Sequence, residues 1–363
     1  MSGKIRFGIV GSGWRSLYYC RIAKAKPDLF EMCGMVCRTE EKALRMAREH
    51  GISVFTYPCD LMHAAPDFVV VAVDKAHVLE VSAEWLRKGA AVLAETPAAV
   101  DRASLRIMKE IAAKQLKFAT AEQYRLYPEN SARIQLIRKD LIGEPQYLYL
   151  SLAHEYHAAS LMRAFLNISP EMPYTIRAYA GAYPTAGTLT RTERITDGRI
   201  SLKKRTCAVI AFADGKTCLY DFDAEQYRSL IRSSHWKLQG TRGEIFDDTV
   251  LWLDEKNTPL QGKIRTDSSI VKTGSYNPNL SQYETIEKIS FGNEILYLPQ
   301  DGLAGLSQDE TAIAKLLVSM AAYAKGNGDA PYSTEESIAD VGMAILLQEA
   351  AETCGCLRSE QLL

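Results

Sequence analysis

The stretch GIVGSGWRS, residues 8–16, decides the fold. It ends an apolar run, turns on glycines and opens an amphipathic segment, so it predicts a strand, a tight turn and a helix. Gly11, Gly13 and Ser16 form a G-x-G-x-x-S pattern. Glycine lets a pyrophosphate approach the backbone, and the helix start offers free N–H groups with partial positive charge. The turn therefore predicts a dinucleotide site, with a ligand-free turn as the alternative, and the candidate contacts are Gly11, Ser12, Gly13, Trp14 and Arg15.

Outward from this turn, the first 123 residues alternate short apolar runs with amphipathic segments. We expect strands at 4–10, 30–37, 53–57, 67–73, 91–95 and 117–123. Almost wholly apolar strands separated by helices indicate a parallel sheet covered on both faces, the doubly wound α/β arrangement. The sequence thus predicts an N-terminal Rossmann domain over residues 1–122.

The pattern changes from about residue 145, where apolar and polar residues alternate through segments such as PQYLYLSL and KTCLYDFDAE. Such alternation is typical of an antiparallel sheet with one solvated face. Two helical stretches follow at 307–326 and 333–355. We therefore expect an α+β substrate and oligomerisation domain over 123–345, with a large, mainly antiparallel open sheet, and a helix end and tail over 346–363.

Composition narrows the class of protein. The 363 residues carry a formal net charge of −1, which indicates neither a nucleic-acid surface nor a membrane patch. The start lacks the pattern of a signal peptide, and no apolar run approaches the roughly 20 residues of a membrane helix. The eight cysteines lie scattered, with no second pair to complete a zinc knuckle. We expect buried thiols, no metal, and a soluble cytoplasmic protein.

The end of the second predicted strand bears on the choice of cofactor. An NAD site usually has Asp or Glu there for the ribose diol. This strand ends in MVCRTEE, with Cys37 at that position and Arg38 and Thr39 after it. A small neutral residue followed by arginine leaves room and charge for a 2′-phosphate, so NADP is favoured. Glu40 or Glu41 could reach the ribose instead, which keeps NAD open.

Several segments together resemble the glucose–fructose oxidoreductase/inositol dehydrogenase family (Gfo/Idh/MocA). They are the glycine turn, VLAETPAAV (92–100), LIGEPQYLYL (141–150), HAASLMRAFL (157–166) and GTRGEI (240–245). The resemblance implies an NAD(P)-dependent enzyme that acts on a sugar, cyclitol or related polyol. It also implies an active site where two domains meet and an open sheet that serves as an oligomer interface.

Departures from the family pattern affect the catalytic residues. The resemblance implies Glu-Lys-Pro at the end of the fifth strand, but Thr96 follows Glu95 here and cannot exchange a proton near neutral pH. It also implies an aspartate four residues before a histidine; His157 aligns with the histidine, whereas Ala153 occupies the aspartate position and Ser160 replaces a later acid. Of the three implied catalytic residues, only His157 remains.

The segment HEYH (154–157) is the candidate catalytic stretch. Two histidines three residues apart are too few ligands for a metal, and they lack the i, i+4 spacing of a zinc-protease helix. Imidazole titrates near neutral pH, and oxidation of a carbinol needs a group that takes the hydroxyl proton. We predict His157 as the leading acid/base, and Glu155, His154 or Tyr156 could orient or replace it; structural histidines are the alternative.

The end of the sixth predicted strand, AEQYRLYPE (121–129), should face the same edge of the sheet. Glu122 is a second possible acid/base there. Predicted substrate contacts are Tyr124, Arg125, Tyr156 and Thr96, and the remaining predicted cofactor contacts are Val73, Glu95, Thr96 and Gln123. Packing or solvation at strand ends is the alternative for these residues.

Two further residues have competing interpretations. Arg15 could pair with a phosphate or be a solvated surface charge. His77 resembles the histidine that follows the third strand in many family members, but counting back from Glu95 places that position at Val78. We therefore predict His77 to be a helix-start residue.

The sequence accordingly predicts an NAD(P)-dependent oxidoreductase that transfers a hydride between nicotinamide and a polyol or ketone, acting as a homodimer or homotetramer. One alternative is redox-assisted cleavage of a glycoside with no net cofactor turnover. Another is a catalytically silent dinucleotide-binding regulator. Product formation with no net change in nicotinamide absorbance would indicate glycoside cleavage rather than net hydride transfer. Tight dinucleotide binding without turnover, together with a partner protein, would indicate a regulator.

Overall fold

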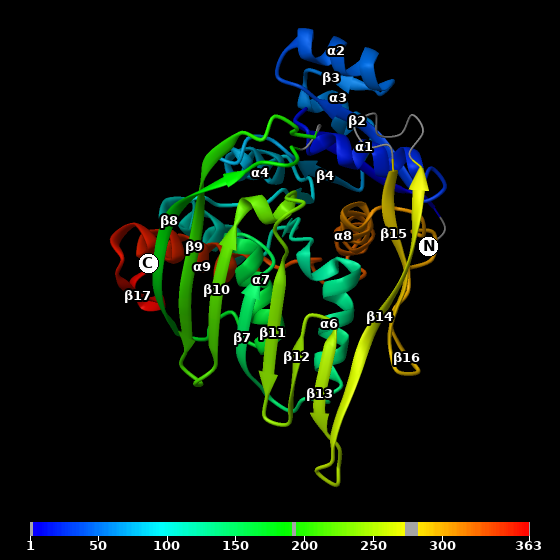
Figure 1. Ribbon diagram of the computed structural model, residues 1–363. Coiled ribbons are helices and arrows are strands. Elements are labelled where there is room, and N and C mark those ends of the chain that lie inside the picture. The colour runs from blue at the N-terminus through cyan, green and yellow to red at the C-terminus, as the bar shows by residue number, and fades with distance from the viewer. Residues whose placement is uncertain (1–2, 191–193, 273–281, 363) are drawn as a thin grey trace. The chain divides into compact units, whose positions relative to one another are not determined.

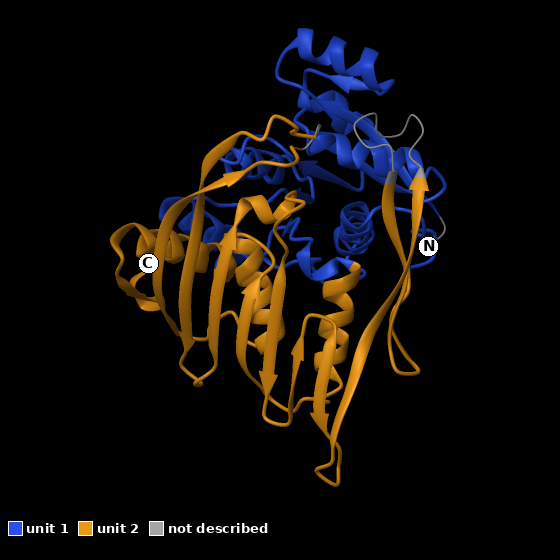
Figure 2. Cartoon of the chain, in the orientation of Figure 1, with its two compact units in different colours: residues 1–127, 300–338 blue, residues 128–299, 339–363 orange. Residues whose placement is uncertain are grey.

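The computed structural model describes residues 3–190, 194–272 and 282–362. The chain divides into two compact units (Figure 2). Unit 1 comprises residues 1–127 and 300–338, and unit 2 comprises 128–299 and 339–363.

A six-stranded parallel sheet forms the centre of unit 1, in the order β3-β2-β1-β4-β5-β6 (Figure 1). The strands are β1 (Ile5–Val10), β2 (Phe30–Val36), β3 (Val54–Phe55), β4 (Phe68–Val71), β5 (Val92–Ala94) and β6 (Phe118–Thr120). The helices between them are α1 (Ser16–Ala25), α2 (Glu40–His50), α3 (Pro58–His63), α4 (Val78–Arg87) and α5 (Arg102–Ala113). This order reverses between β1 and β4, which confirms the predicted doubly wound Rossmann sheet.

Local signals explain where these helices begin and end. Thr39 caps α2 by accepting a hydrogen bond from the backbone N–H of Lys42, and Gly51 ends the helix with a left-handed φ of +60°. Asp101 and Ser104 form a reciprocal capping box at the start of α5. These caps fix where the helices begin and end. The residues between each strand and the next helix are thereby left to carry functional side chains at the sheet edge.

The chain returns to unit 1 after the second sheet. Helix α8 (Gln308–Ala324) buries Ile313, Leu316 and Met320 in the same core as Phe7 of β1. The sequence prediction placed this helix in the second domain because chain order says nothing about which core an apolar helix joins. Its burial shows that unit 1 is built from two separate segments.

Unit 2 is built on an eleven-stranded sheet in the order β16-β15-β14-β13-β12-β11-β7-β10-β9-β8-β17. Its strands are β7 (Pro145–Ser151), β8 (Tyr174–Ala186), β9 (Ile200–Phe212), β10 (Thr217–Asp223), β11 (His235–Gly240), β12 (Gly243–Phe246), β13 (Thr249–Leu253), β14 (Pro259–Lys272), β15 (Gln282–Phe291), β16 (Glu294–Tyr297) and β17 (Cys356–Arg358). Within this sheet, β7 and β10 are the only described strands that pair in parallel. The predicted mainly antiparallel sheet is therefore confirmed.

Helices cover one face of this sheet. Phe165 of α7 (Glu155–Leu166) packs on Trp236 of β11 with ring centroids 5.0 Å apart. Arg133 of α6 (Pro128–Arg138) lies over the same indole, 5.1 Å from its centroid. Helix α9 (Thr334–Thr353) begins in unit 1 and continues in unit 2. The alternation seen in the sequence thus reflects one covered face and one open face.

Two expectations about composition can be compared with the structure. No helix among the described residues is long and apolar enough to span a membrane. All eight cysteines are free, but only Cys20, Cys37 and Cys218 are buried. The expectation of buried thiols is wrong for Cys59, Cys354 and Cys356, which are exposed.

Candidate functional site

The glycine turn lies between the end of β1 and the start of α1, at the carboxyl edge of the parallel sheet. Gly11 has φ +112°, and a Cβ built on it would lie 2.4 Å from the Ala72 carbonyl oxygen, so only glycine fits. Val73 packs over the same point. A Cβ on Gly13 would meet nothing within 4 Å. The backbone at Gly13 is therefore open to a pyrophosphate, as a dinucleotide site requires.

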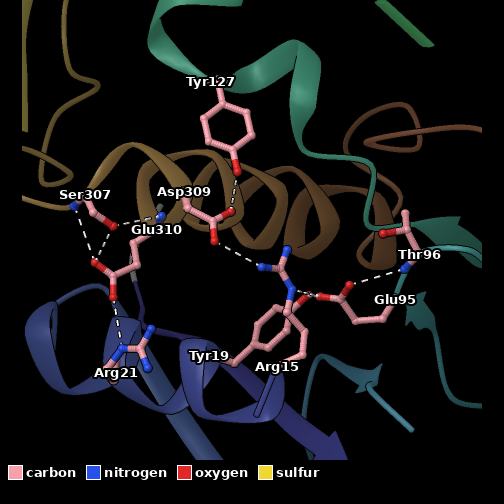
Figure 3. Close-up of polar contacts among 9 residues, drawn as sticks. All are labelled: Arg15, Tyr19, Arg21, Glu95, Thr96, Tyr127, Ser307, Asp309 and Glu310. Atoms are coloured by element: carbon pink, nitrogen blue, oxygen red, sulfur yellow. Dashed lines mark hydrogen bonds and ion pairs between the residues drawn. The ribbon is translucent and has the colours of Figure 1, made fainter. Parts of the chain in front are cut away.

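Arg15, beside this turn, belongs to a buried ion-pair network (Figure 3). Its Nε lies 2.8 Å from Glu95 Oε1, and its Nη1 lies 3.1 Å from Asp309 Oδ2. Burial alone would lower the pKa of Arg15, but the carboxylates of Glu95 and Asp309 raise it well above its usual value. The interpretation as a solvated surface charge is wrong, because this guanidinium is neutralised inside unit 1.

Glu95, at the end of β5, is held on three sides. It accepts hydrogen bonds from Arg15 Nε, from the Tyr19 hydroxyl and, at 3.2 Å, from the backbone N–H of Thr96 (Figure 3). Burial and the Glu95 charge together raise the pKa of Tyr19 well above its usual value, so its hydroxyl stays a donor. Three donors thus hold the Glu95 carboxylate in place, one of them the guanidinium of Arg15.

Sequence reasoning missed Tyr19 and Asp309 in this network. Tyr127 also joins it, donating from its hydroxyl to Asp309 Oδ1 at 2.7 Å (Figure 3). Asp309 lies two residues after Ser307, the N-cap of α8. An aspartate in the first turn of a helix is an ordinary helix signal, and nothing in the sequence relates it to Arg15, 294 residues away.

The end of β2 presents the residues predicted to select the cofactor. Cys37 is buried and belongs to the hydrophobic core of unit 1. Arg38 and Thr39 are exposed, as are Glu40 and Glu41 in the first turn of α2. The thiol therefore leaves space at this position, and the exposed side chains beyond it are arginine, threonine and two carboxylates.

The end of β6 contributes four polar or aromatic residues in a row. Gln123 is buried, and its amide accepts from Arg15 Nη2 at 3.0 Å and donates to the Ala121 carbonyl at 2.7 Å in the orientation that satisfies both atoms. Glu122 accepts from the backbone N–H of Tyr124 at 2.9 Å. Gln123 thus extends the Arg15 network.

Tyr124 and Arg125, predicted to bind substrate, have neighbours within unit 1. The Tyr124 ring meets the Tyr127 ring edge-on, with centroids 5.0 Å apart. Arg125 Nη1 forms a 2.8 Å ion pair with Glu336 and lies 5.0 Å over the Tyr332 ring. These contacts anchor both side chains at the sheet edge.

The HEYH stretch forms an aromatic cluster in unit 2, which we call the histidine cluster: His154, Tyr156, His157 and Tyr227. His154 is the N-cap residue of α7; its backbone N–H donates to the Tyr227 hydroxyl at 2.9 Å, and its Nδ1 lies 2.6 Å from the same oxygen. The His157 ring lies 5.0 Å from the His154 ring and 4.4 Å from the Tyr156 ring, centroid to centroid. The structure thus brings the predicted catalytic residues of this stretch together.

The start of α7 carries an unusual backbone. Glu155, its first residue, has φ +42°, which disfavours a side chain, and its N–H donates to the Tyr220 hydroxyl at 3.3 Å. His157 is 4% exposed, and Ala153 and Ser160 are fully buried. The strained backbone of Glu155 fixes the direction in which the chain passes from His154 into α7.

The sequence predicts no metal site and places His77 at the start of a helix. No group of three or more potential ligands gathers among the residues that the structure describes. His77 caps the start of α4 with an exposed side chain. Its interpretation as a helix-start residue is confirmed.

Comparison with known proteins supports the Rossmann fold of the N-terminal segment. Residues 5–123 match the model of an oxidoreductase family with an NAD-binding Rossmann fold, Gfo/Idh/MocA. No curated protein matches the sequence.

Three solved structures that are similar in fold have low sequence identity. An oxidoreductase from Agrobacterium radiobacter, in complex with NAD+, L-tartaric acid and magnesium, has a TM-score of 0.67 and 12% identity over 99% of this chain and 100% of its own. A putative myo-inositol dehydrogenase from Sinorhizobium meliloti has a TM-score of 0.64 and 16% identity over 98% of this chain and 99% of its own. A scyllo-inositol dehydrogenase from Lactobacillus casei has a TM-score of 0.62 and 17% identity over 98% of both chains. The glycine turn, the parallel sheet and the family match agree that residues 5–123 resemble the NAD-binding Rossmann fold of the Gfo/Idh/MocA oxidoreductase family.

Proposed function

We propose that this protein is an NAD(P)-dependent oxidoreductase that transfers a hydride between nicotinamide and a sugar, cyclitol or related polyol or ketone. The observation that carries the proposal is the open backbone at Gly13, in a domain matched to an NAD-binding oxidoreductase family. The inositol dehydrogenases among the similar folds support the substrate class. A bound nicotinamide would supply the hydride donor or acceptor.

We further propose NADP as the preferred cofactor. The buried Cys37 leaves space where an NAD site has a carboxylate, and exposed Arg38 can pair with a 2′-phosphate. Exposed Glu40 and Glu41 oppose this preference through their charge. NAD remains the alternative, and the bound NAD+ of the Agrobacterium radiobacter oxidoreductase supports it.

His157 is the proposed leading acid/base residue. Oxidation of a carbinol releases a hydroxyl proton, and an imidazole is suited to accept it near neutral pH. Tyr156 and His154 pack against the ring and restrict its orientation. Ala153 occupies the position of the family aspartate, and Glu155, two residues further along the chain, is the proposed assistant.

The first experiment is a thermal-shift titration of the purified protein with NADP(H) and NAD(H). A ligand at 100 times its dissociation constant adds about 2.7 kcal/mol of stability, which is readily measured. We expect a larger shift with NADP(H). If neither nucleotide shifts the melting temperature and none co-purifies, the oxidoreductase proposal is rejected.

The catalytic assignment is tested by replacing His157 with alanine, with His77→Ala as the matched control. We expect His157→Ala to lower kcat by about 10²–10⁴-fold while the nucleotide thermal shift stays that of the wild type. His77 is exposed at a helix start, so its loss should leave kcat within about twofold. A wild-type rate in the His157 variant would remove that residue from the mechanism.

Self-association is also proposed, as a homodimer or homotetramer. The open face of the eleven-stranded sheet exposes Tyr179, Val209, Phe246 and Leu251, which strand register places on the same side. Exposed apolar side chains gathered on one face favour a protein partner, and an open sheet suits a second copy. Light scattering of the wild type should show an oligomer, and Phe246→Lys should weaken this association. A monomeric wild type would refute the proposal.

A further inference from the structure

Three side chains near the start of β11, in unit 2, form a hydrogen-bonded chain that the proposed hydride transfer does not use. The Ser233 hydroxyl lies 2.7 Å from Nε2 of His235, and Nδ1 of the same imidazole lies 2.8 Å from Asp247 Oδ2. These are the contacts through which a base takes the proton of a nucleophile and is itself oriented by a carboxylate. We call Ser233, His235 and Asp247 the serine triad.

The carboxylate of the serine triad decides which imidazole nitrogen can accept a proton. An ionised Asp247 accepts hydrogen bonds but cannot donate one, so Nδ1 of His235 carries the hydrogen of this pair. In the neutral imidazole, Nε2 is then the acceptor, and it faces the Ser233 hydroxyl. This is the tautomer that a general base needs in order to take the serine proton.

The backbone holds Asp247 firmly against the core of unit 2. Asp247 follows β12 in the turn to β13, where its φ of +50° is a left-handed conformation that aspartate tolerates. Its Oδ1 accepts a hydrogen bond from the Trp236 backbone N–H at 3.1 Å, and its carbonyl accepts one from the Trp236 indole N–H at 3.1 Å. Trp236 is fully buried, so the carboxylate that orients His235 is fixed to a rigid part of the fold.

Backbone donors lie beside the serine hydroxyl. The N–H groups of Ser233 and Ser234 form no hydrogen bond with any residue that the structure describes. The Ser233 carbonyl accepts a hydrogen bond from Gln226 Nε2 at 2.9 Å, which anchors this part of the chain. Backbone N–H groups at and after a nucleophilic serine can stabilise the negative charge that develops on an attacked carbonyl oxygen.

We propose that the serine triad is an acyl-transfer site that hydrolyses carboxylic esters with a short acyl chain. This activity is separate from the proposed oxidoreductase reaction and does not rest on it. Ser233 is exposed, so an ester can reach its hydroxyl. Ser233 also precedes β11 and therefore lies beyond the paired strands whose open face is proposed for self-association.

A cavity next to the serine triad supports the choice of substrate class. It measures about 210 Å³, and Ser234 and Asp247 line it together with Arg133, Ile264 and Ile289. Pockets for drug-sized ligands are larger, about 300–1,000 Å³. The cavity therefore suits a short acyl group better than a long aliphatic chain.

The reaction balances with water as the co-reactant. Ser233 Oγ forms a bond to the ester carbonyl carbon while His235 Nε2 takes the hydroxyl proton. The bond from that carbon to the leaving oxygen then breaks, the leaving alcohol takes the proton from Nε2, and Ser233 is left acylated. A water molecule gives a proton to Nε2 and attacks the acyl carbon. The bond to Ser233 Oγ breaks, Oγ recovers the proton from Nε2, and the carboxylic acid departs.

Covalent labelling of the wild type tests this inference without any variant. The full chain is treated with diisopropyl fluorophosphate, which bonds to an activated serine oxygen with loss of fluoride, and mass spectrometry identifies the labelled peptide. Hydrolysis of p-nitrophenyl acetate and p-nitrophenyl decanoate then measures the rate and the preferred chain length. The variants are Ser233→Ala, His235→Gln and Asp247→Asn. The controls are Ser201→Ala, at an exposed serine of β9 in the same unit, and His77→Ala, which removes an exposed imidazole elsewhere.

We expect the label on Ser233 and faster hydrolysis of the acetate than of the decanoate ester. Ser233→Ala and His235→Gln should each lower the rate by about 10²-fold or more, and both controls should stay within about twofold of the wild type. Asp247→Asn should slow labelling while the melting temperature stays near that of the wild type, because the amide no longer fixes the required tautomer.

A wild type whose Ser233 stays unlabelled would overturn this inference, as would a Ser233→Ala variant that hydrolyses the acetate ester at the wild-type rate. Faster hydrolysis of the decanoate ester would overturn the assigned substrate class. None of these results depends on nucleotide binding, so the proposed oxidoreductase function is tested separately.

Discussion

Stability measured as a function of pH gives a test of the Glu122 environment that needs neither cofactor nor substrate. The folded protein raises the pKa of this carboxyl from its usual 4.5 to about 8, mainly through burial. A shift of one pKa unit corresponds to about 1.36 kcal/mol, so a shift of roughly 3.5 units corresponds to a pH-dependent free energy on the order of 5 kcal/mol.

The sign of the effect follows from proton binding. Between pH 4.5 and 8 the folded protein holds the proton on Glu122, whereas the unfolded chain does not. The contribution of Glu122 to stability is therefore fully present below pH 4.5 and is lost as the pH rises to 8. Glu122→Gln removes this titration, so its free energy of unfolding relative to the wild type should rise by about 1.4 kcal/mol per pH unit between pH 4.5 and 8 and level off above pH 8.

Urea unfolding followed by tryptophan fluorescence at pH 5, 6, 7, 8 and 9 measures this difference directly. Glu110→Gln, at an exposed position of α5, is the control, and its curve should run parallel to that of the wild type. The subtraction cancels every other titrating group. Parallel curves for the wild type and Glu122→Gln would show that Glu122 is already ionised at pH 5, and the argued environment would be wrong.

The remaining predictions concern the glycine turn and its neighbours. Gly11→Ala should cost more than about 1 kcal/mol in urea unfolding, because its Cβ would meet the Ala72 oxygen at 2.4 Å. Gly13→Ala should fold normally but show a smaller nucleotide thermal shift; an unchanged shift would place the pyrophosphate elsewhere. Arg15→Ala should cost about 3–5 kcal/mol, since it leaves the buried Glu95 carboxylate and the partly exposed Asp309 carboxylate without their cation, and a loss below about 1 kcal/mol would refute the network. Arg38→Ala should reduce the thermal shift with NADP(H) and spare that with NAD(H); equal losses would argue against the 2′-phosphate contact.

The first sheet was predictable from sequence because its strands carry a strong local signal. Segments such as Phe68–Val71 are buried along their whole length, as expected for a strand covered by helices on both faces. The long strands β14 and β15 were not predicted. The segment PLQGKIRTDSSIVK has few apolar residues and little alternation of its own, although β15, the strand it pairs with, is the next strand in the chain.

Part of the candidate site was predictable from sequence and part was not. The glycine turn is a local motif, and the sequence places Gly11 and Gly13 where the structure has them. The partners of Arg15 were not predictable, because Asp309 reaches the turn only through the packing of α8 in unit 1. A charged residue beside a phosphate-binding turn looks like a ligand in sequence, but only packing shows whether another charge already neutralises it.

The two carboxyl groups at the ends of β5 and β6 illustrate how environment separates roles. Both are buried. Glu95 forms an ion pair with Arg15 and accepts a hydrogen bond from the Tyr19 hydroxyl. Burial raises the pKa of Glu122 to about 8, although the Tyr124 N–H, Arg125 and Arg15 lower it. Glu95 therefore organises this edge through its ion pair, and Glu122 is the carboxyl group whose surroundings bring its pKa toward neutral pH.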